Sequence, residues 1–177
     1  MTKILLSCGR FSTKVALKVF LESENMPANS FNDFLYISTD KQFLERLNVP
    51  ELLTFHLPYI SSNENLNIQN GIDFSQAEIK LVLKLQSYSK IVLVIDSFIF
   101  PYLFLLNALS ELSLEHNIQL QVLCLDSFSH QHFLDKNLEN KITYIVPKEY
   151  VQFLPNAKNQ KKNFEKKIVK QIIMSAK

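Results

Sequence analysis

Small polar residues follow several apolar runs of this sequence, and their side chains are of kinds that bind ligands or take part in catalysis. Cys8, Asp96 and Asp126 are the strongest candidates, because a thiol and two carboxylates could serve as nucleophile and acid–base groups. The full set comprises Ser7, Cys8, Gly9, Arg10, Ser38, Thr39, Asp40, Asp96, Ser97, Asp126 and Ser127. Since Ser, Thr and Asp are also the residues that helix N-caps require, capping is the more ordinary explanation of the pattern.

The cysteines and histidines do not form a pattern typical of a catalytic or metal site. A nucleophilic Cys8 would need a nearby base, and the sequence points to none in particular. His130 and His132 lie two residues apart, a spacing that does not direct both rings to one site on a helix, and Cys124 upstream adds no second ligand pair. We therefore predict no metal and no other cofactor, and we interpret both cysteines as buried, reduced thiols.

Glycine is too scarce for the loops that usually bind phosphate. Gly9 and Gly71 are the two glycines among 177 residues, and no GxGxxG or GxxxxGK[ST] motif follows any apolar run. Phosphate loops need backbone N–H groups turned toward the ligand, which often requires the positive φ and close approach that glycine permits. Large side chains at Phe98, Ile99 and Phe100 instead follow the run that ends near Asp96. The sequence therefore predicts that nucleotides do not bind.

The elements that position these residues alternate between strand and helix. Three apolar runs, ILLS, IVLVI and ITYIV, are continuous, which is typical of strands covered on both faces. The expected strands are 4–7, 34–38, 52–57, 91–95, 118–125 and 142–146. This alternation predicts an α/β fold: a three-layer Rossmann-like sheet, mostly parallel, with about six strands and flanking helices. We expect one such domain over residues 1–155.

Several capping signals predict where helices begin. Ser75 with Glu78 has the spacing of a capping box at the start of a long helix. Asp40 opens a short helix through Leu47, and Pro101 suits the first turn of a helix that ends near His116. Residues 58–71, rich in Asn and Ser, are expected to form a loop, and residues 156–162 a polar link into the last helix.

The last segment, 156–177, is predicted to be a basic amphipathic helix packed on the same domain. It holds seven Lys against one Glu, although the net charge of the whole chain is only +2. One side carries Phe164, Ile168, Val169, Ile172 and Ile173, and the other carries Lys166, Lys167 and Lys170. The lysines could attract nucleic acid or an anionic membrane, but a solvated face of a packed helix is the more ordinary interpretation. No signal peptide or membrane-spanning run is recognised, so a cytoplasmic location is expected.

The order of the segments resembles the N-terminal, nucleotide-binding domain of the FtsZ/tubulin family. That family's second strand and its Asn-Thr-Asp turn are similar to FLYISTDKQFLERL. Its long helix and next strand are similar to SQAEIKLVLKLQSYSKIVLVID, and the helix, strand and Pro-Phe-Ser turn that follow are similar to NALSELSLEHNIQLQVLCLDSFS. ITYIVPKEYVQFL resembles its sixth strand, and the last helix would match the family's central helix. The GGGTGTG signature is replaced by the bulky residues 98–102. Phe164 stands where a ring stacks on guanine, and Ile168 stands where the family has a base-reading Asn or Asp.

The resemblance implies a degenerate, non-catalytic FtsZ/tubulin-like domain that has lost GTP binding and acts by contacting a protein. The candidate partner is an FtsZ/tubulin-type filament subunit, in cell division or in another assembly. The expected partner surface is the former nucleotide face, formed by Arg10, Phe11, Phe98, Ile99, Phe100 and Tyr102. Self-association is a further possibility. The alternative is a small Rossmann-like enzyme or ligand-binding protein that uses the crevice at the carboxyl ends of the strands.

Overall fold

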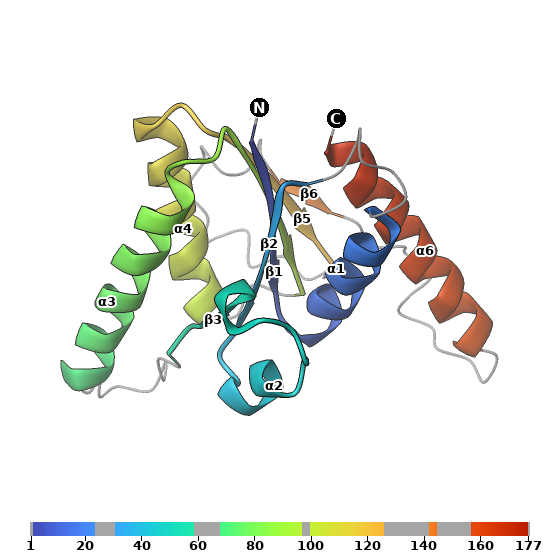
Figure 1. Ribbon diagram of the computed structural model, residues 1–177, viewed down its shortest axis with the longest axis horizontal. Helices are drawn as coiled ribbons and strands as arrows, with labels where there is room; N and C mark the ends of the chain where they lie inside the picture. The colour runs from blue at the N-terminus through green and yellow to red at the C-terminus, as the bar shows by residue number, and fades with distance from the viewer. Residues whose placement is uncertain are drawn as a thin grey trace.

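The computed structural model describes residues 2–23, 31–58, 68–96, 100–125, 142–144 and 157–176. Figure 1 shows a central sheet seen nearly edge-on between two layers of helices. The carboxyl ends of the strands point downward in this view, toward the start of α1 (Arg10–Ser23) and the short helix α2 (Lys41–Glu45).

Six parallel strands form the sheet, which confirms the predicted Rossmann-like α/β fold. The strands are β1 (Lys3–Cys8), β2 (Asp33–Ser38), β3 (Thr54–His56), β4 (Lys90–Ile95), β5 (Gln119–Cys124) and β6 (Ile142–Tyr144). Their order is β3-β2-β1-β4-β5-β6, and each neighbouring pair is parallel. This is the strand order of many doubly wound, dinucleotide-binding sheets, in which the crevice at the switch point lies between the ends of β1 and β4.

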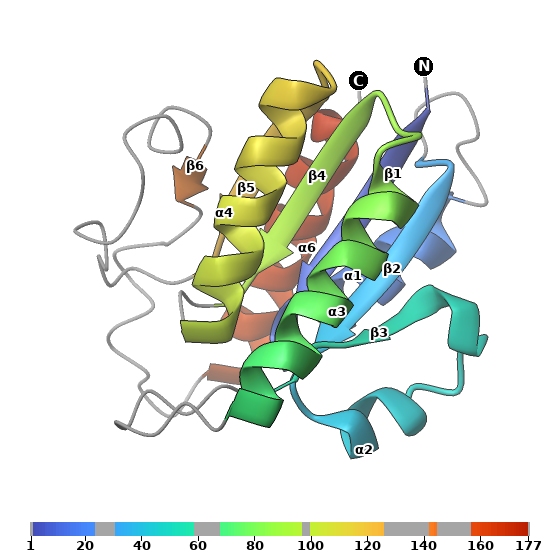
Figure 2. The same cartoon turned by 90° about the vertical axis from the view of Figure 1, so that its left-hand side faces the viewer.

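Helices cover both faces of the sheet. One face carries α3 (Ile68–Leu85) and α4 (Phe100–Glu115), and the other carries α1 and α6 (Ala157–Ser175), as Figures 1 and 2 show. Each central strand is therefore apolar on both sides: Leu93 packs toward α3 and α4, whereas Val92 and Val94 pack toward α1 and α6. This double burial explains the continuous apolar runs in the sequence.

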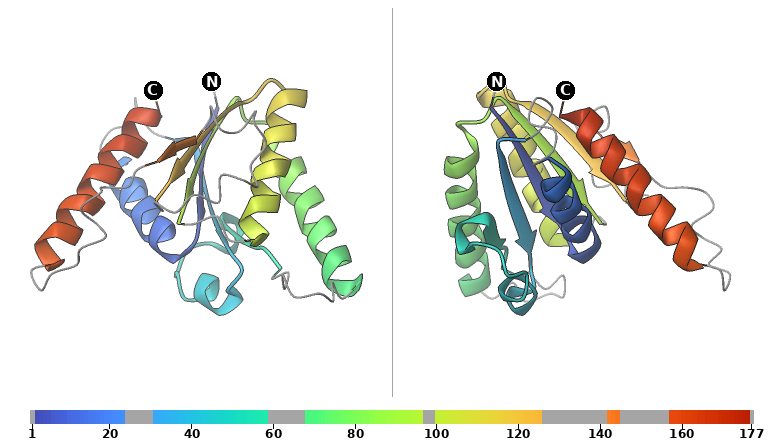
Figure 3. Two further views of the ribbon diagram at one scale, coloured as in Figure 1. Left: turned by 180° about the vertical axis from the view of Figure 1, so that it is seen from behind. Right: turned by 45° about the vertical axis from the view of Figure 1, so that its right-hand side comes forward.

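The last helix lies beside α1 on one face of the sheet, as both views of Figure 3 show. Its side chains Phe164, Ile168 and Ile172 are at most 7% exposed and belong to the core on this face. The Lys3 side chain donates a hydrogen bond to the Ala176 carbonyl, which ties the end of α6 to the first strand. No helix among the described residues is both long and apolar enough to cross a bilayer.

Three expected boundaries were wrong. The capping-box serine, Ser75, lies inside α3, which begins at Ile68, so the last residues of the expected 58–71 loop are helical. The helix α6 begins at Ala157, within the expected polar link. In both cases a helix already stabilised by packing continues through polar residues, because propensity and capping signals are weaker than tertiary contacts. Residues 52 and 53, expected in the strand 52–57, belong to a 3-10 turn (Glu51–Leu53) that precedes β3.

Candidate functional site

The turn from β1 into α1 is built around Gly9. Its φ of +111° lies in a region that L side chains rarely adopt. A Cβ atom added here would lie 2.3 Å from Oδ2 of Asp96, at the end of the neighbouring strand β4. Gly9 is therefore required by the close approach of a carboxylate of the chain itself.

The Asp96 carboxylate occupies the N-terminus of α1. The backbone N–H of Phe11 donates to Oδ2 at 2.8 Å, and that of Ser12 donates to Oδ1 at 2.5 Å. These N–H groups have no acceptor within the helix, and in many Rossmann-like domains such groups bind a phosphate of the ligand. Burial raises the pKa of Asp96 above its ordinary value, although the two hydrogen bonds oppose the shift. A carboxyl group of the protein itself thus stands at the end of the helix.

The polar residues at the end of β2 also serve as caps. Asp40 accepts a hydrogen bond from the Phe43 N–H at 2.9 Å as the N-cap of α2, as predicted. Its other oxygen lies 2.6 Å from the Arg10 guanidinium, which also lies over the Phe43 ring at 5.6 Å from the centroid. The hydrogen bond from Arg10, followed by that from Phe43, lowers the pKa of Asp40. The Ser38 hydroxyl accepts from the Asp40 N–H at 3.0 Å.

The thiols are not placed for nucleophilic chemistry. Cys8 is 0% exposed, and burial, followed by the charge of Asp96, raises the pKa of its thiol. Cys124 is buried as well. A thiol that stays protonated and has no access to solvent is a packing residue. The structure therefore agrees with the interpretation of both cysteines as buried thiols.

An aromatic pair lies where α1 meets α6. The rings of Phe11 and Phe164 are nearly parallel, at 7°, with centroids 6.2 Å apart. Phe164 is 7% exposed, and Ile168, one turn further along α6, is 0% exposed. The ring that the family resemblance assigned to base stacking is thus stacked on another side chain of the chain.

The predicted partner residues are divided between surface and core. Arg10 is exposed, and Phe11 is half-buried. Tyr102 is only 4% exposed and packs among core residues beneath α3 and α4, where burial raises its pKa to about 12. It therefore has no surface to offer a partner in this conformation. Phe98 and Ile99, and the side chain of Phe100, lie outside the described residues, as do Ser97, Asp126, Ser127, His130 and His132.

An open hollow of about 460 Å³ lies beside α2 and β3, away from the predicted crevice. Its lining residues are Lys41, Leu44, Glu45, Val49, Glu51, Thr54 and His56. Neither Cys8 nor Asp96 lines it, so it is not the pocket expected for an enzyme of the alternative type. Among the described residues, no three His, Cys, Asp or Glu side chains lie close enough together to hold a metal ion.

Two important contacts escaped the sequence reasoning. Asp96 was considered as a ligand-binding or capping residue, but its helix, α1, lies 84 residues earlier in the chain. Glu165 is 5% exposed and forms ion pairs with Lys18 and Lys14 of α1. The sequence does contain a hint of this contact, because Glu165 is the single acid in the lysine-rich last segment.

Comparison of the chain with protein-family models, with curated proteins and with solved structures gives no match.

Proposed function

We propose that this chain is a non-catalytic Rossmann-like domain that does not bind nucleotides and acts by binding a protein partner. Asp96 is the observation that carries the proposal. Its carboxylate accepts hydrogen bonds from the first N–H groups of α1, at the switch point where this type of sheet usually binds a phosphate.

A nucleotide phosphate would have to displace this carboxylate or lie next to it. Two unit charges 4 Å apart repel by about 4 kcal/mol at the effective dielectric constant of a protein surface. Displacement would instead break both hydrogen bonds of Asp96 and leave a partly buried carboxylate without these two donors. Both routes oppose nucleotide binding, and the Phe11–Phe164 stack also takes up a ring face that a base could use.

Isothermal titration calorimetry of the full chain with GTP, GDP and ATP tests the first half of the proposal. We expect no binding heat for any of the three with Mg²⁺ present. Micromolar affinity for any of them would reject the proposal, because the anion position would then be open to a ligand.

The edge of the sheet around α2 and the start of α1 is the proposed partner surface. Arg10 has 74% of its side chain exposed, next to the half-buried Phe11 and Phe43. A mixed aromatic and arginine surface is typical of the centres of protein interfaces. We expect Arg10→Glu to weaken partner binding while leaving the fold unchanged, since its ion pair with Asp40 is exposed and contributes little to stability. Lys80→Glu on α3, an exposed position on the opposite face, is the matched control.

The resemblance to the FtsZ/tubulin family suggests which partner to test first. Purified FtsZ polymers can be sedimented with the chain, with Arg10→Glu and with Lys80→Glu. The proposal predicts co-sedimentation of the chain and of Lys80→Glu but less of Arg10→Glu. If all three proteins remain in the supernatant, a filament subunit is not the partner, and affinity capture with the same variants would identify another candidate. Light scattering of the chain alone tests self-association.

A further inference from the structure

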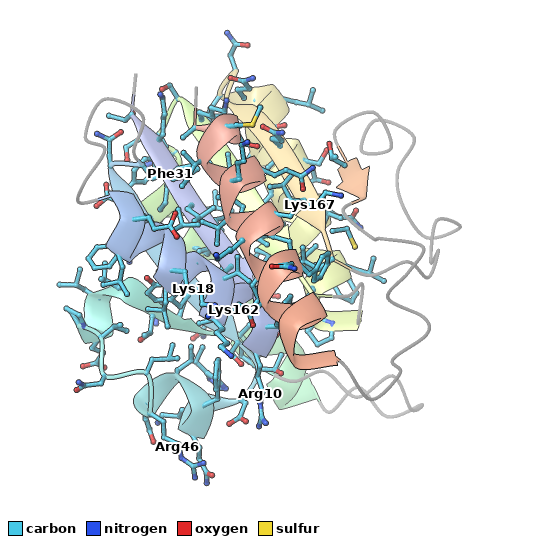
Figure 4. All side chains as sticks on the ribbon, turned by 90° about the vertical axis from the view of Figure 1, so that its right-hand side faces the viewer. Arg10, Lys18, Phe31, Arg46, Lys162 and Lys167 are labelled. Carbon is cyan, nitrogen blue, oxygen red and sulfur yellow. The ribbon has the colours of Figure 1, made fainter. Side chains whose placement is uncertain are left out.

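The outer surface of α1 and α6 is strongly basic. Seven Lys and Arg side chains are described there, and Figure 4 looks onto this surface, which we call the basic face. Its members are Arg10, Lys14, Lys18, Lys162, Lys166, Lys167 and Lys170. The acidic side chains described on these two helices are Glu22 and Glu165. In Figure 4, Lys18 and Lys162 are seen together between the two helices, and Lys167 lies on the other side of α6.

Two acids contact these cations: Asp40, the N-cap of α2, pairs with Arg10, and Glu165 of α6, which is turned inward, pairs with Lys14 and Lys18. Glu165 is 5% exposed, and it holds the Lys18 ammonium by a hydrogen bond and lies 3.6 Å from that of Lys14. Burial disfavours its ionised form, but the contacts with Lys18 and Lys14 outweigh this effect and lower its pKa. Glu165 thus holds two lysines at the junction of the helices, while their side chains remain 58% (Lys14) and 40% (Lys18) exposed.

The cations form two regular rows. Arg10, Lys14 and Lys18 follow one another at four-residue intervals on α1, and Lys162, Lys166 and Lys170 do the same on α6. Four residues of helix rise about 6 Å, so the cations of each row are evenly spaced. Those of the α1 row are paired with Asp40 and Glu165, so the α6 row supplies more of the net positive charge. Both helices are packed against the sheet, which keeps the rows in a fixed relation. Regular spacing of this kind suits a ligand that is itself a regular line of negative charge.

The opposite side of the molecule differs. From residue 75 onward, α3 carries Lys80 and Lys84 against Glu78, and α4 contributes Glu111 and Glu115. Large exposed apolar side chains on this side are Ile79, Leu83, Phe104 and Leu114. The positive charge is therefore concentrated on one face, as expected of an electrostatic docking surface.

We propose that the basic face binds the phosphate backbone of a nucleic acid, independently of base sequence. Lysine and arginine contacts to phosphates supply most of the affinity in binding of this kind. An anionic membrane fits less well, because most apolar side chains of α6, such as Ile168 and Ile172, are buried against the sheet, and the largely exposed ones described on these two helices are Leu21 and Met174. This surface is distinct from the Asp96 position, so the inference stands apart from the proposed lack of nucleotide binding.

The test measures fluorescence anisotropy of a labelled duplex of about 20 base pairs with the full chain, from about 50 to about 200 mM KCl. Each phosphate neutralised contributes about −0.9 to the slope of log K against log salt concentration. We expect Lys166→Gln/Lys170→Gln to make this slope shallower by about 1.8. The control, Lys41→Gln/Lys80→Gln, removes the same charge from exposed positions on α2 and α3 and should leave the slope unchanged.

Three outcomes would overturn the proposal. The first is no duplex binding at the lowest salt concentration. The second is an equal reduction of the salt slope in the two double variants, which would indicate an effect of net charge rather than of this face. The third is sedimentation with phosphatidylserine vesicles but no duplex binding, which would identify a lipid surface as the ligand. Circular dichroism of each variant verifies the fold, and the exposure of all four positions makes loss of folding unexpected.

Discussion

Replacing Asp96 tests the contact on which the proposed function depends. In Asp96→Ala, the N–H groups of Phe11 and Ser12 lose their acceptors at 2.8 and 2.5 Å. Asp96→Asn is the matched variant, because its amide keeps one oxygen to accept from one of these groups but carries no charge. Both variants leave the apolar core untouched, so their effects report on the end of α1.

The magnitude follows from two opposing contributions. Hydrogen bonds to charged groups contribute about 1.5–3 kcal/mol each, and an N-cap replaced by Ala usually costs about 0.5–2 kcal/mol. Burial of the carboxylate, which raises its pKa, opposes this gain. We therefore expect Asp96→Ala to lower the free energy of unfolding by about 2 kcal/mol and Tm by about 4–8 °C, at about 2–4 °C per kcal/mol for a chain of this size. Asp96→Asn should cost about half as much.

Thermal unfolding and amide hydrogen exchange together separate capping from general packing. In Asp96→Ala, the Phe11 and Ser12 amides should exchange faster than in the wild-type chain, while the Val92 amide in the sheet changes only with global stability. Inorganic phosphate should raise Tm more in Asp96→Ala than in the wild-type chain, because the helix end becomes available to an anion. Unchanged Tm and unchanged exchange in the variant would refute the capping argument. Equal stabilisation of both proteins by phosphate would refute the claim that the carboxylate occupies the anion position.

Three further predictions concern neighbouring contacts. Glu165→Gln should lower the free energy of unfolding by about 1–2 kcal/mol at neutral pH, because its charged contact with Lys18 is lost. The pKa of Glu165 is lowered in the folded state, so this contribution is present at neutral pH and is lost as the pH falls below the ordinary Glu value. Urea denaturation curves of the variant and the wild type should therefore converge in acid. Gly9→Ala should cost more than the ~1–2 kcal/mol of a left-handed backbone alone, since the new Cβ would contact the Asp96 carboxylate, and a calorimetric Tm equal to that of the wild type would contradict this. The Cys8 thiol should react with Ellman's reagent only on unfolding, and rapid labelling of the native chain would show that the position is accessible.

The sequence could predict the sheet because its strands are buried on both faces. Short continuous apolar runs rich in β-branched residues, such as Ile91–Ile95, are typical of strands covered on both faces, and all six expected strands are present in the structure. Helix boundaries were harder. Ser75 and Glu78 match a capping box, yet the start of a helix depends on where packing stops supporting it, and α3 begins seven residues earlier, at Ile68.

The sequence could predict which residues form the candidate site but not which of them contact one another. The polar residues at the strand ends were identified, and Asp40 was correctly expected to open a helix. What the sequence could not show is that Asp96 caps a helix formed 84 residues earlier, because that contact depends on β1 and β4 being neighbours in the sheet. For the same reason Tyr102 was expected at the surface, whereas the first turn of α4 directs it into the core.

Arg10 belongs to both the basic face and the proposed partner surface, so its variants can be used to compare the two binding activities. It ends the α1 row of the basic face, and it also lies at the proposed partner surface through Asp40 and Phe43. Arg10→Glu should therefore weaken both duplex binding and protein binding, whereas Lys166→Gln/Lys170→Gln should weaken duplex binding alone. If the lysine variant also loses the protein partner, one partner spans both surfaces. If the lysine variant retains the partner, the two surfaces bind separate ligands. A saturating duplex should then interfere only with the protein contacts near Arg10, where the two surfaces overlap.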